Sequence, residues 1–204
     1  MIVAQTGGKE KGQIALAPAP EIQYNDKKGK KAAPVNTALL VIDMQNDYLW
    51  EKRKPRFAYD TEKLTGAVNG LIRRYAGEGA DVIYIRHIIQ NLPTNRLLFG
   101  YSLAGTEGAE LFSGLEKVSD LCFDKLLGDA FTNRELLELV KARGYEELHL
   151  CGLDKFGCVA NTALGAAKRG ITARILREGT ATVMPEAKAA KMKTKLTEAK
   201  IEYI

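Results

Sequence analysis

The stretch EELHLCGLDKFGCVANTALGAAKRG, residues 146–170, joins a strand pattern to a helix pattern through a short loop. Its apolar half ends at Cys151 and Gly152, and its small-residue half begins at Cys158. The start of a helix stabilises a thiolate and lowers the pKa of a cysteine there. Two interpretations of Cys158 therefore stay open, a nucleophile with a lowered pKa or a small buried residue, whereas Cys151 fits simple packing.

Strand and helix patterns alternate along residues 37–204. Continuous apolar runs such as ALLVI at residues 38–42 are typical of strands that are buried on both faces. Thr132 and Glu135 form a capping-box pattern at the start of one helix. We expect strands at residues 38–42, 81–89, 120–125, 147–153, 171–179 and 201–204, and helices at residues 61–79, 132–144, 158–170 and 185–200. Repeated strand–helix–strand units predict an α/β fold, doubly wound in three layers (αβα), with a mostly parallel six-stranded sheet.

The composition fits one globular domain. The 204 residues are 46% apolar and 27% charged, which is enough for a single sizeable core. Residues 1–36 lack sustained periodicity, so we expect an N-terminal extension or arm there and the folded domain at residues 37–204. The sequence has no apolar signal region and no run as long as a membrane helix. Three cysteines do not suggest a disulfide framework, so we expect a cytoplasmic protein with no membrane partner.

Basic residues gather in three groups and give a net charge of +5. One group lies in residues 9–31, and another lies in the predicted last helix. The third is the run of Lys52, Arg53, Lys54 and Arg56. A nucleic-acid surface would explain such groups, but interleaved aromatic residues and known binding motifs are missing from the sequence. We therefore expect solvated charged faces and no nucleic-acid partner.

Chemically distinct side chains stand at the ends of the predicted strands. Asp43 ends the first strand, Lys125 ends the third, and the fourth strand leads through a loop to Cys158. Because the carboxyl ends of parallel strands meet at one edge, where ligands bind, these groups are expected to converge. Taken alone, Asp43 fits a turn cap and Lys125 fits a solvated lysine, so their joint placement is the signal. We expect the Lys125 ammonium to lie near solvent.

Four motifs follow one another in a characteristic order. ALLVIDMQNDY, GTEGAEL, FDKLLGDAFTNREL and CGLDKFGCVANTALGAAKRG resemble the successive signatures of the isochorismatase-like cysteine hydrolases. That superfamily includes nicotinamidases, N-carbamoylsarcosine amidases, ureidoacrylate and biuret hydrolases, and the isochorismatases. The resemblance covers residues 38–179 and implies a Rossmann-like isochorismatase-type fold. It also implies an Asp–Lys–Cys catalytic set, which falls on Asp43, Lys125 and Cys158.

The resemblance further implies a reaction through a thioester. Asp43 would accept the thiol proton, Lys125 would hold the carboxylate, and Cys158 would attack an amide-type carbonyl. The oxyanion donors would be the backbone amides of Asp154 and Cys158. The family often has a cis peptide in this loop, which here falls between Leu153 and Asp154.

The histidine count departs from the metal-dependent members of that superfamily. Nicotinamidases typically carry a metal site built from an Asp and several His, whereas this sequence has only His87 and His149. We therefore expect no metal and no cofactor. The loop LDKFG also places Asp154 and Lys155 where small neutral residues are common in the family.

These features predict an amidohydrolase whose substrate is a small linear amide, ureide or carbamoyl compound, cleaved to release ammonia or an amine. An isochorismatase-type enol-ether hydrolase, which would not need Cys158, and a non-catalytic α/β binding protein of the same fold remain open. The expected substrate-binding residues lie on loops after strands and are Tyr48, Trp50, Arg86, His87 and Phe156. We also expect a homo-oligomer, a dimer or tetramer, with residues 14–18 of the arm contributing contacts.

Overall fold

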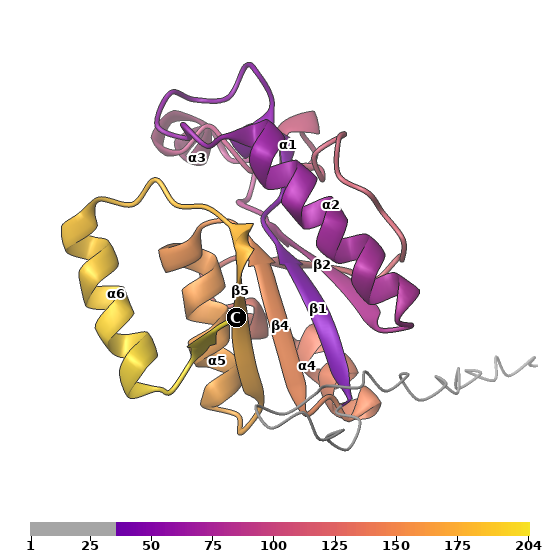
Figure 1. Cartoon of the computed structure of the whole chain (residues 1–204). Helices are drawn as coiled ribbons and strands as arrows, with labels where there is room; N and C mark the ends of the chain where they lie inside the picture. The colour runs from indigo at the N-terminus through magenta and orange to yellow at the C-terminus, as the bar shows by residue number, and fades with distance from the viewer. Residues whose placement is uncertain (1–35) are drawn as a thin grey trace, which may run out of the picture.

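A six-stranded sheet forms the centre of the molecule (Figure 1). The computed structural model describes residues 36–204. The strands are β1 (Thr37–Ile42), β2 (Asp81–His87), β3 (Cys122–Lys125), β4 (Glu147–Gly152), β5 (Thr172–Thr180) and β6 (Glu202–Tyr203). They lie in the order β3-β2-β1-β4-β5-β6, and every neighbouring pair is parallel. The predicted doubly wound α/β fold is confirmed, and the sheet is parallel throughout its described strands rather than mostly parallel.

Helices cover both faces of the sheet (Figure 1). The long helix α2 (Thr61–Gly77) packs on one face, and α4 (Arg134–Arg143), α5 (Ala160–Ala167) and α6 (Glu186–Glu198) pack on the other. Shorter helical segments are α1 (Asn46–Leu49), α3 (Pro93–Leu98), the 3-10 turns η1 (Glu107–Ala109) and η2 (Ala130–Thr132), and the π-helical turn η3 (Lys155–Val159). Within residues 36–204, no helix is long and apolar enough to cross a membrane.

The central strand β1 shows why the sheet is sandwiched. All six of its residues are buried, and alternate side chains enter opposite hydrophobic clusters. Leu40 and Ile42 face the cluster under α4, α5 and α6, whereas Leu39 and Val41 face the cluster under α2. A strand with apolar residues on both faces is stable only between two covering layers. The continuous apolar run in the sequence therefore predicted this burial correctly.

Two helix starts differ from the expected ones. The capping-box prediction at Thr132 and Glu135 is wrong, because Asn133 is the N-cap of α4 and its side chain accepts a hydrogen bond from Leu136 N at 3.0 Å. Thr132 instead closes the preceding 3-10 turn. The helix expected from Cys158 onward also begins later, at Ala160, because it is preceded by the π-helical turn.

Two predictions concern residues N-terminal to the described part of the chain. The predicted arm lies outside the described residues except for its last residue, Asn36, so its boundary and its contacts stay predictions. Residues 14–18 and the lysines of residues 9–31 also lie outside the described part of the chain.

Gly152 ends β4 at the point where that strand touches β1. Its φ is +104°, and a Cβ placed there would lie 2.0 Å from the backbone oxygen of Ile42. The next amide, Leu153 N, donates to that same oxygen at 2.8 Å. Only a glycine allows this approach of the two backbones. The chain winds outward in both directions from the β1–β4 pair, so Gly152 lies at the topological switch point of the sheet.

Gly152→Ala is expected to destabilise the protein by more than ~2 kcal/mol, because the added carbon meets backbone and the φ is unfavourable for alanine. The matched control is Gly66→Ala on α2, where an added Cβ meets nothing within 4 Å. That change is expected to stabilise the exposed helix by up to about 1 kcal/mol. Urea unfolding followed by circular dichroism measures both, and equal effects at the two glycines would contradict the close approach at Gly152.

Candidate active site

Asp43, Lys125 and Cys158 meet at the carboxyl edge of the sheet. Asp43 follows β1, Lys125 is the last residue of β3, and Cys158 lies in the turn after β4. Lys125 Nζ donates to Asp43 Oδ2 at 2.9 Å and to Cys158 Sγ at 3.1 Å. The three side chains that the sequence placed at strand ends are therefore in direct contact.

Asp43 is held in an uncommon backbone conformation. Its φ is +53°, in the left-handed region that few non-glycine residues occupy. Hydrogen bonds from Asp43 N to Ile85 O, and from Gln45 N to Asp43 O, both 2.9 Å long, hold the turn. The side chain is almost fully buried, and its Oδ1 has no hydrogen-bond partner among residues 36–204. One carboxylate oxygen thus holds Lys125, and the other remains an open acceptor.

Lys125 is a core residue, not a surface one. The expectation that its ammonium lies near solvent is wrong, because the residue is only 1% exposed. Burial lowers the pKa of Lys125, but the charges of Asp43 and Cys158 and the hydrogen bonds to both outweigh it, so the pKa is raised overall. Lys125 is therefore a permanent cation, stabilised by a buried ion pair.

The Cys158 thiol is protonated at rest. Burial and, after it, the charge of Asp43 raise the pKa of Cys158 to about 12, against the lowering influence of Lys125. The expectation of a thiol pKa lowered by a helix start is therefore wrong. The physical reason is that the thiol is partly buried beside a carboxylate, and that it lies within a π-helical turn rather than at the first turn of α5.

The side chain of Asp154 fastens the loop that carries Cys158. Oδ1 accepts from Phe156 N at 3.0 Å and from Thr182 Oγ1 at 2.8 Å. Oδ2 accepts from Val183 N at 2.9 Å and from Tyr59 Oη at 3.1 Å. One carboxylate thereby connects the turn that carries Cys158, the segment after β5 and the segment before α2.

The peptide bond between Leu153 and Asp154 is trans, so the expected cis bond is wrong. The trans form is the default, and the alternative costs about 3 kcal/mol for a residue other than proline. The chain turns here instead through Gly152, with φ +104°, and Gly157, with φ −101° and ψ −111°. Asp154 anchors this turn through its side chain.

The segment after Asp43 anchors the surrounding loops. Gln45 is fully buried, and its side-chain amide donates to His87 O at 3.0 Å and Ala109 O at 2.7 Å and accepts from His87 N at 2.8 Å. Asp47 Oδ2 accepts from Ser102 N at 2.7 Å. These supporting residues were missed by sequence reasoning, although they lie inside the quoted motif ALLVIDMQNDY. Tyr59 carried no comparable signal.

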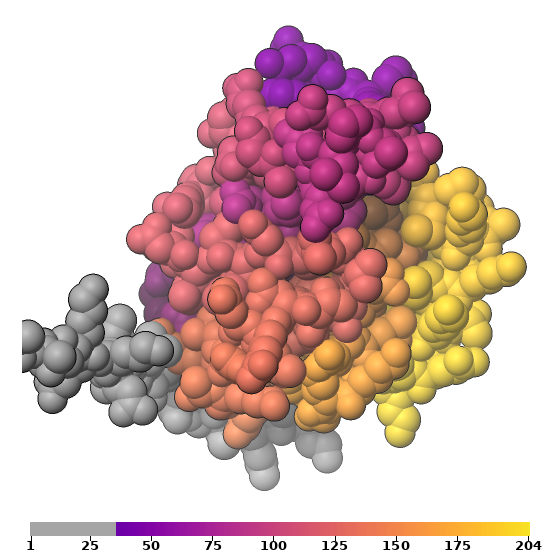
Figure 2. Space-filling view, turned by 180° about the vertical axis from the view of Figure 1, so that it is seen from behind, coloured from indigo at the N-terminus to yellow at the C-terminus, as the bar shows by residue number. Residues whose placement is uncertain are grey.

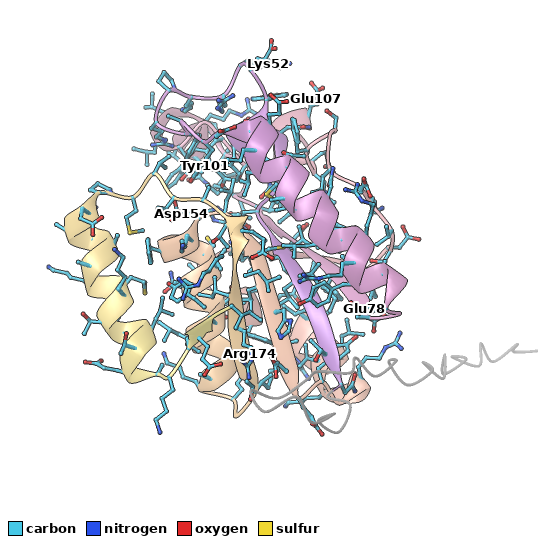
Figure 3. The ribbon with its side chains drawn as sticks, in the orientation of Figure 1. Lys52, Glu78, Tyr101, Glu107, Asp154 and Arg174 are labelled. Atoms are coloured by element: carbon cyan, nitrogen blue, oxygen red, sulfur yellow. The ribbon has the colours of Figure 1, made fainter. Side chains whose placement is uncertain are left out.

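Two of the expected substrate-binding residues, Tyr48 and His87, lie near the predicted catalytic residues. Tyr48 Oη lies 3.3 Å from His87 Nδ1 and accepts from Ser102 Oγ at 2.8 Å. Burial and the Lys125 charge lower the pKa of His87, so its imidazole is neutral at neutral pH. His87 also lines a cavity of about 300 Å³ together with Tyr101 and other residues of that end of the sheet. Figure 3 shows Tyr101 and Asp154 at this end of the molecule.

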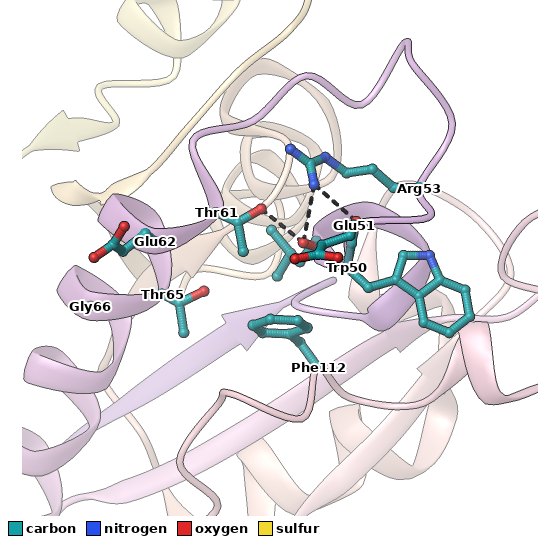
Figure 4. Close-up of a pocket in the computed structure, with 9 residues that line it drawn as sticks. Trp50, Glu51, Arg53, Thr61, Glu62, Thr65, Gly66 and Phe112 are labelled. Carbon is teal, nitrogen blue, oxygen red and sulfur yellow. Dashed lines mark hydrogen bonds between the residues drawn. The ribbon is translucent and has the colours of Figure 1, made fainter.

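The other three expected substrate-binding residues, Arg86, Phe156 and Trp50, lie elsewhere. Arg86 is held by Asp124 at 2.8 Å and by Glu110 at 2.5 Å. Phe156 is buried in the cluster under α5 and α6. Trp50 lines a different cavity, of about 550 Å³, between the start of α2 and Phe112 (Figure 4). Their assignment to substrate binding gains no support from these positions.

Both histidine side chains contact other groups of the protein. His87 Nε2 lies 3.2 Å from Leu126 O, and its Nδ1 contacts Tyr48. His149 contacts the Tyr75 hydroxyl and lies 2.5 Å from Glu147 Oε1. Across residues 36–204, no three His, Cys, Asp or Glu side chains are grouped so that they could hold a metal ion. The described donors therefore do not fit a metal centre of the nicotinamidase type.

Comparisons with known proteins agree with this fold. The model of the isochorismatase domain matches residues 37–197. The uncharacterized isochorismatase family protein YddQ of Bacillus subtilis is 26% identical over 149 residues, which are 72% of this chain and 79% of the relative. A protein of Arabidopsis thaliana named "Probable inactive nicotinamidase" is 26% identical over 168 residues, 74% of this chain and 83% of the relative. The structure of the pyrazinamidase of Pyrococcus horikoshii in complex with zinc superposes with a TM-score of 0.70 at 24% identity, and covers 83% of this chain and 98% of that one.

The parallel sheet, the switch-point site and the family match define the class of this protein. The chain belongs to the isochorismatase family, and it is a hydrolase of that family.

Removing the charge of Asp43 and removing the charge of Lys125 are expected to change the reactivity of Cys158 in opposite directions. Asp43 raises the pKa of the thiol, so Asp43→Asn increases the thiolate fraction and speeds alkylation by iodoacetamide. Lys125 lowers that pKa, so Lys125→Met slows alkylation. The rates are measured across a pH series by peptide mapping of the labelled cysteines.

Each single variant leaves one buried charge unpaired, which costs about 3–5 kcal/mol, so the double variant Asp43→Asn/Lys125→Met is the control for folding. Cys151 is fully buried, and its labelling reports global unfolding. If both single variants shifted Cys158 labelling in the same direction while Cys151 stayed protected, the electrostatic coupling of the three groups would be refuted.

Proposed function

We propose that this hydrolase cleaves the C–N bond of a small linear amide, ureide or carbamoyl compound through a thioester on Cys158. The proposal rests on the Lys125 ammonium, which contacts both other residues. Its Nζ lies 2.9 Å from Asp43 Oδ2 and 3.1 Å from Cys158 Sγ. A carboxylate base, a fixed cation and a thiol within mutual reach are the groups that nucleophilic acyl transfer requires. Asp43, Lys125 and Cys158 are the proposed catalytic residues.

In the first step Asp43 is the general base. Because the pKa of Cys158 is raised to about 12, the thiol is protonated at neutral pH and must lose its proton as it attacks. Asp43 Oδ1, which lacks a partner in the described part of the chain, is the oxygen that takes this proton. The sulfur then forms a bond to the carbonyl carbon, and the carbonyl π electrons move to oxygen. Lys125 keeps its proton and stabilises the negative charge on sulfur during the transfer.

The tetrahedral oxyanion needs hydrogen-bond donors that are already in place. The proposed donors are the backbone N–H groups of Asp154 and Cys158, each of which would contribute about 3 kcal/mol. The Asp154 N–H has no backbone acceptor among residues 36–204. The four hydrogen bonds to its side chain restrict the rotation of this peptide, and such restriction is what a preformed oxyanion site requires.

The intermediate collapses when the C–N bond breaks. Asp43 returns the proton to the leaving nitrogen, which departs as ammonia or an amine and leaves an acyl thioester on Cys158. A water molecule then attacks the thioester carbonyl and gives its proton to Asp43. The C–S bond breaks, the acid product leaves, and the proton returns to the Cys158 sulfur. The cycle needs no redox partner and no metal.

An enol-ether hydrolase or a non-catalytic protein of the same fold is the competing possibility. Neither would use a thiol held by a lysine and a carboxylate, so the contacts of Cys158 favour the amide reaction. The relative named as probably inactive makes a direct assay essential.

Ammonia release from a panel of acyclic amides, ureides and carbamoyl compounds tests the proposal. Cys158→Ala is expected to reduce turnover at least about a thousandfold, as loss of the nucleophile does in comparable enzymes. The matched control is Cys122→Ala, which removes a half-buried thiol outside the catalytic set and is expected to leave turnover unchanged. EDTA is expected to have no effect. Turnover that survives Cys158→Ala, or that EDTA abolishes and zinc restores, would contradict the mechanism.

A further inference from the structure

The basic segment at residues 52–56 holds cations that differ in their partners. Lys52 Nζ lies 3.7 Å from a Glu107 carboxylate oxygen. The Arg53 guanidinium donates four hydrogen bonds to backbone oxygens of its own loop, those of Leu49, Trp50, Phe57 and Tyr59. Lys54 Nζ donates to Phe99 O at 2.6 Å. These three residues therefore have structural roles, and Arg56 does not share them.

Arg56 lies across two aromatic rings without an anionic partner. Its guanidinium carbon is 4.9 Å from the ring centre of Phe57 and 4.5 Å from that of Tyr101. It makes no hydrogen bond or ion pair with any other residue of 36–204. Stacking on two rings fixes the plane of a guanidinium and leaves its N–H edge free, which is the form that binds a carboxylate in a bidentate manner.

The ring under Arg56 belongs to the wall of the cavity beside the catalytic set. Tyr101, Phe99, His87 and Leu126 line this cavity of about 300 Å³, and none of its lining residues carries a carboxylate. Figure 2 shows the indigo segment that includes residues 50–56 against the magenta segment near residue 100, at one end of the molecule. Arg56 itself does not line the cavity, but it stacks on Tyr101, so it places an unpaired positive charge beside the wall of a cavity whose lining has no carboxylate.

Side-chain contacts connect Tyr101 to Tyr48 and His87. The Tyr101 ring packs edge-on against Tyr48 at 5.8 Å, and Tyr48 Oη lies 3.3 Å from His87 Nδ1. Leu126, which also lines the cavity, directly follows Lys125 in the chain. A small molecule in this cavity would lie between His87 and Leu126, the chain neighbour of Lys125, and the Tyr101 ring on which Arg56 stacks.

We infer that the substrate carries a carboxylate at the end remote from the scissile bond and that Arg56 binds it. The inference rests on the proposed function and narrows its substrate class to small acyclic amide or carbamoyl acids. Lys125, already paired with Asp43, cannot serve this carboxylate, and neither can Arg86, which is paired with Asp124 and Glu110. Arg56 is thus assigned as a specificity-determining residue rather than a catalytic one.

Matched substrate pairs test the inference. Oxamate, malonamate and succinamate are compared with their methyl esters, which keep the amide but lose the charge. The wild-type enzyme is expected to prefer at least one acid over its ester, with a preference that falls as salt is added. Arg56→Gln is expected to raise KM for the acid about tenfold to a hundredfold, because one charge-assisted contact is lost. Neither kcat for the acid nor the rate of hydrolysis of the ester is expected to change.

Two further variants separate charge from packing. Arg56→Lys keeps the charge without the planar fork, so it is expected to restore part of the affinity for the acid. Arg74→Gln is the control, because Arg74 also lies over an aromatic ring, 5.2 Å from the centre of Tyr75, but on α2 away from the cavity. It is expected to change neither KM nor the preference for acids.

Binding is measured separately so that the two proposals can fail independently. Calorimetric titration of the Cys158→Ala protein with the same acids and esters reports the subsite without turnover. Arg56-dependent binding of an acid, with no hydrolysis of any compound by the wild-type enzyme, would support the anion subsite and refute the proposed function. Equal binding of acids and esters, or equal losses for both in Arg56→Gln, would overturn the inference.

Discussion

The buried ion pair between Asp43 and Lys125 is the constraint on which the site depends. Both side chains are almost completely withdrawn from water, and a charge in that setting is tolerated only with its partner in contact. The pair joins the end of β1 to the end of β3, two strands that are separated in the sheet by β2. Because Lys125 also contacts the Cys158 sulfur, the same ammonium positions the thiol. The three strand ends are thus held together by one cation.

As a result of these contacts, the Cys158 sulfur is protonated and uncharged in the resting protein. Because the pKa of Cys158 is raised to about 12, the proposed mechanism needs a base that takes the thiol proton during attack. A protonated, partly buried thiol is poorly reactive toward oxidants and alkylating agents, and in the proposed mechanism this would protect Cys158 between turnovers. In the proposed mechanism, the unpartnered oxygen of Asp43 is the base that takes the thiol proton.

Much of the fold and the positions of the three central residues could be predicted from the sequence. Strand ends in a parallel sheet converge by geometry, so Asp43, Lys125 and the turn with Cys158 could be assigned to one edge before any contact was known. Burial could not be predicted in the same way. Whether Lys125 faces water depends on which loops cover the end of β3, and those loops are irregular.

The electrostatics and the loop anchors depended on contacts between distant segments. The raised pKa of Cys158 follows from its depth and from the orientation of Asp43, which periodicity does not encode. The hydrogen bonds that Asp154 accepts come from Tyr59, Phe156, Thr182 and Val183, in three separate parts of the chain. The start of α4 could not be assigned to a single residue from the sequence, because Thr132 and Asn133 are both suitable N-caps and only Asn133 takes that role.

The most direct test of a thioester on Cys158 is mass spectrometry of the enzyme quenched in acid during turnover of an amide substrate. Acid preserves a thioester, so the intact protein should gain the mass of the acyl group, and peptide mapping should place that mass on Cys158. Hydroxylamine should remove it, and Cys122→Ala should leave it in place. Sustained hydrolysis with no adduct under conditions that trap rapid intermediates, or an adduct on Cys122 or Cys151, would contradict the assignment of Cys158 as the nucleophile.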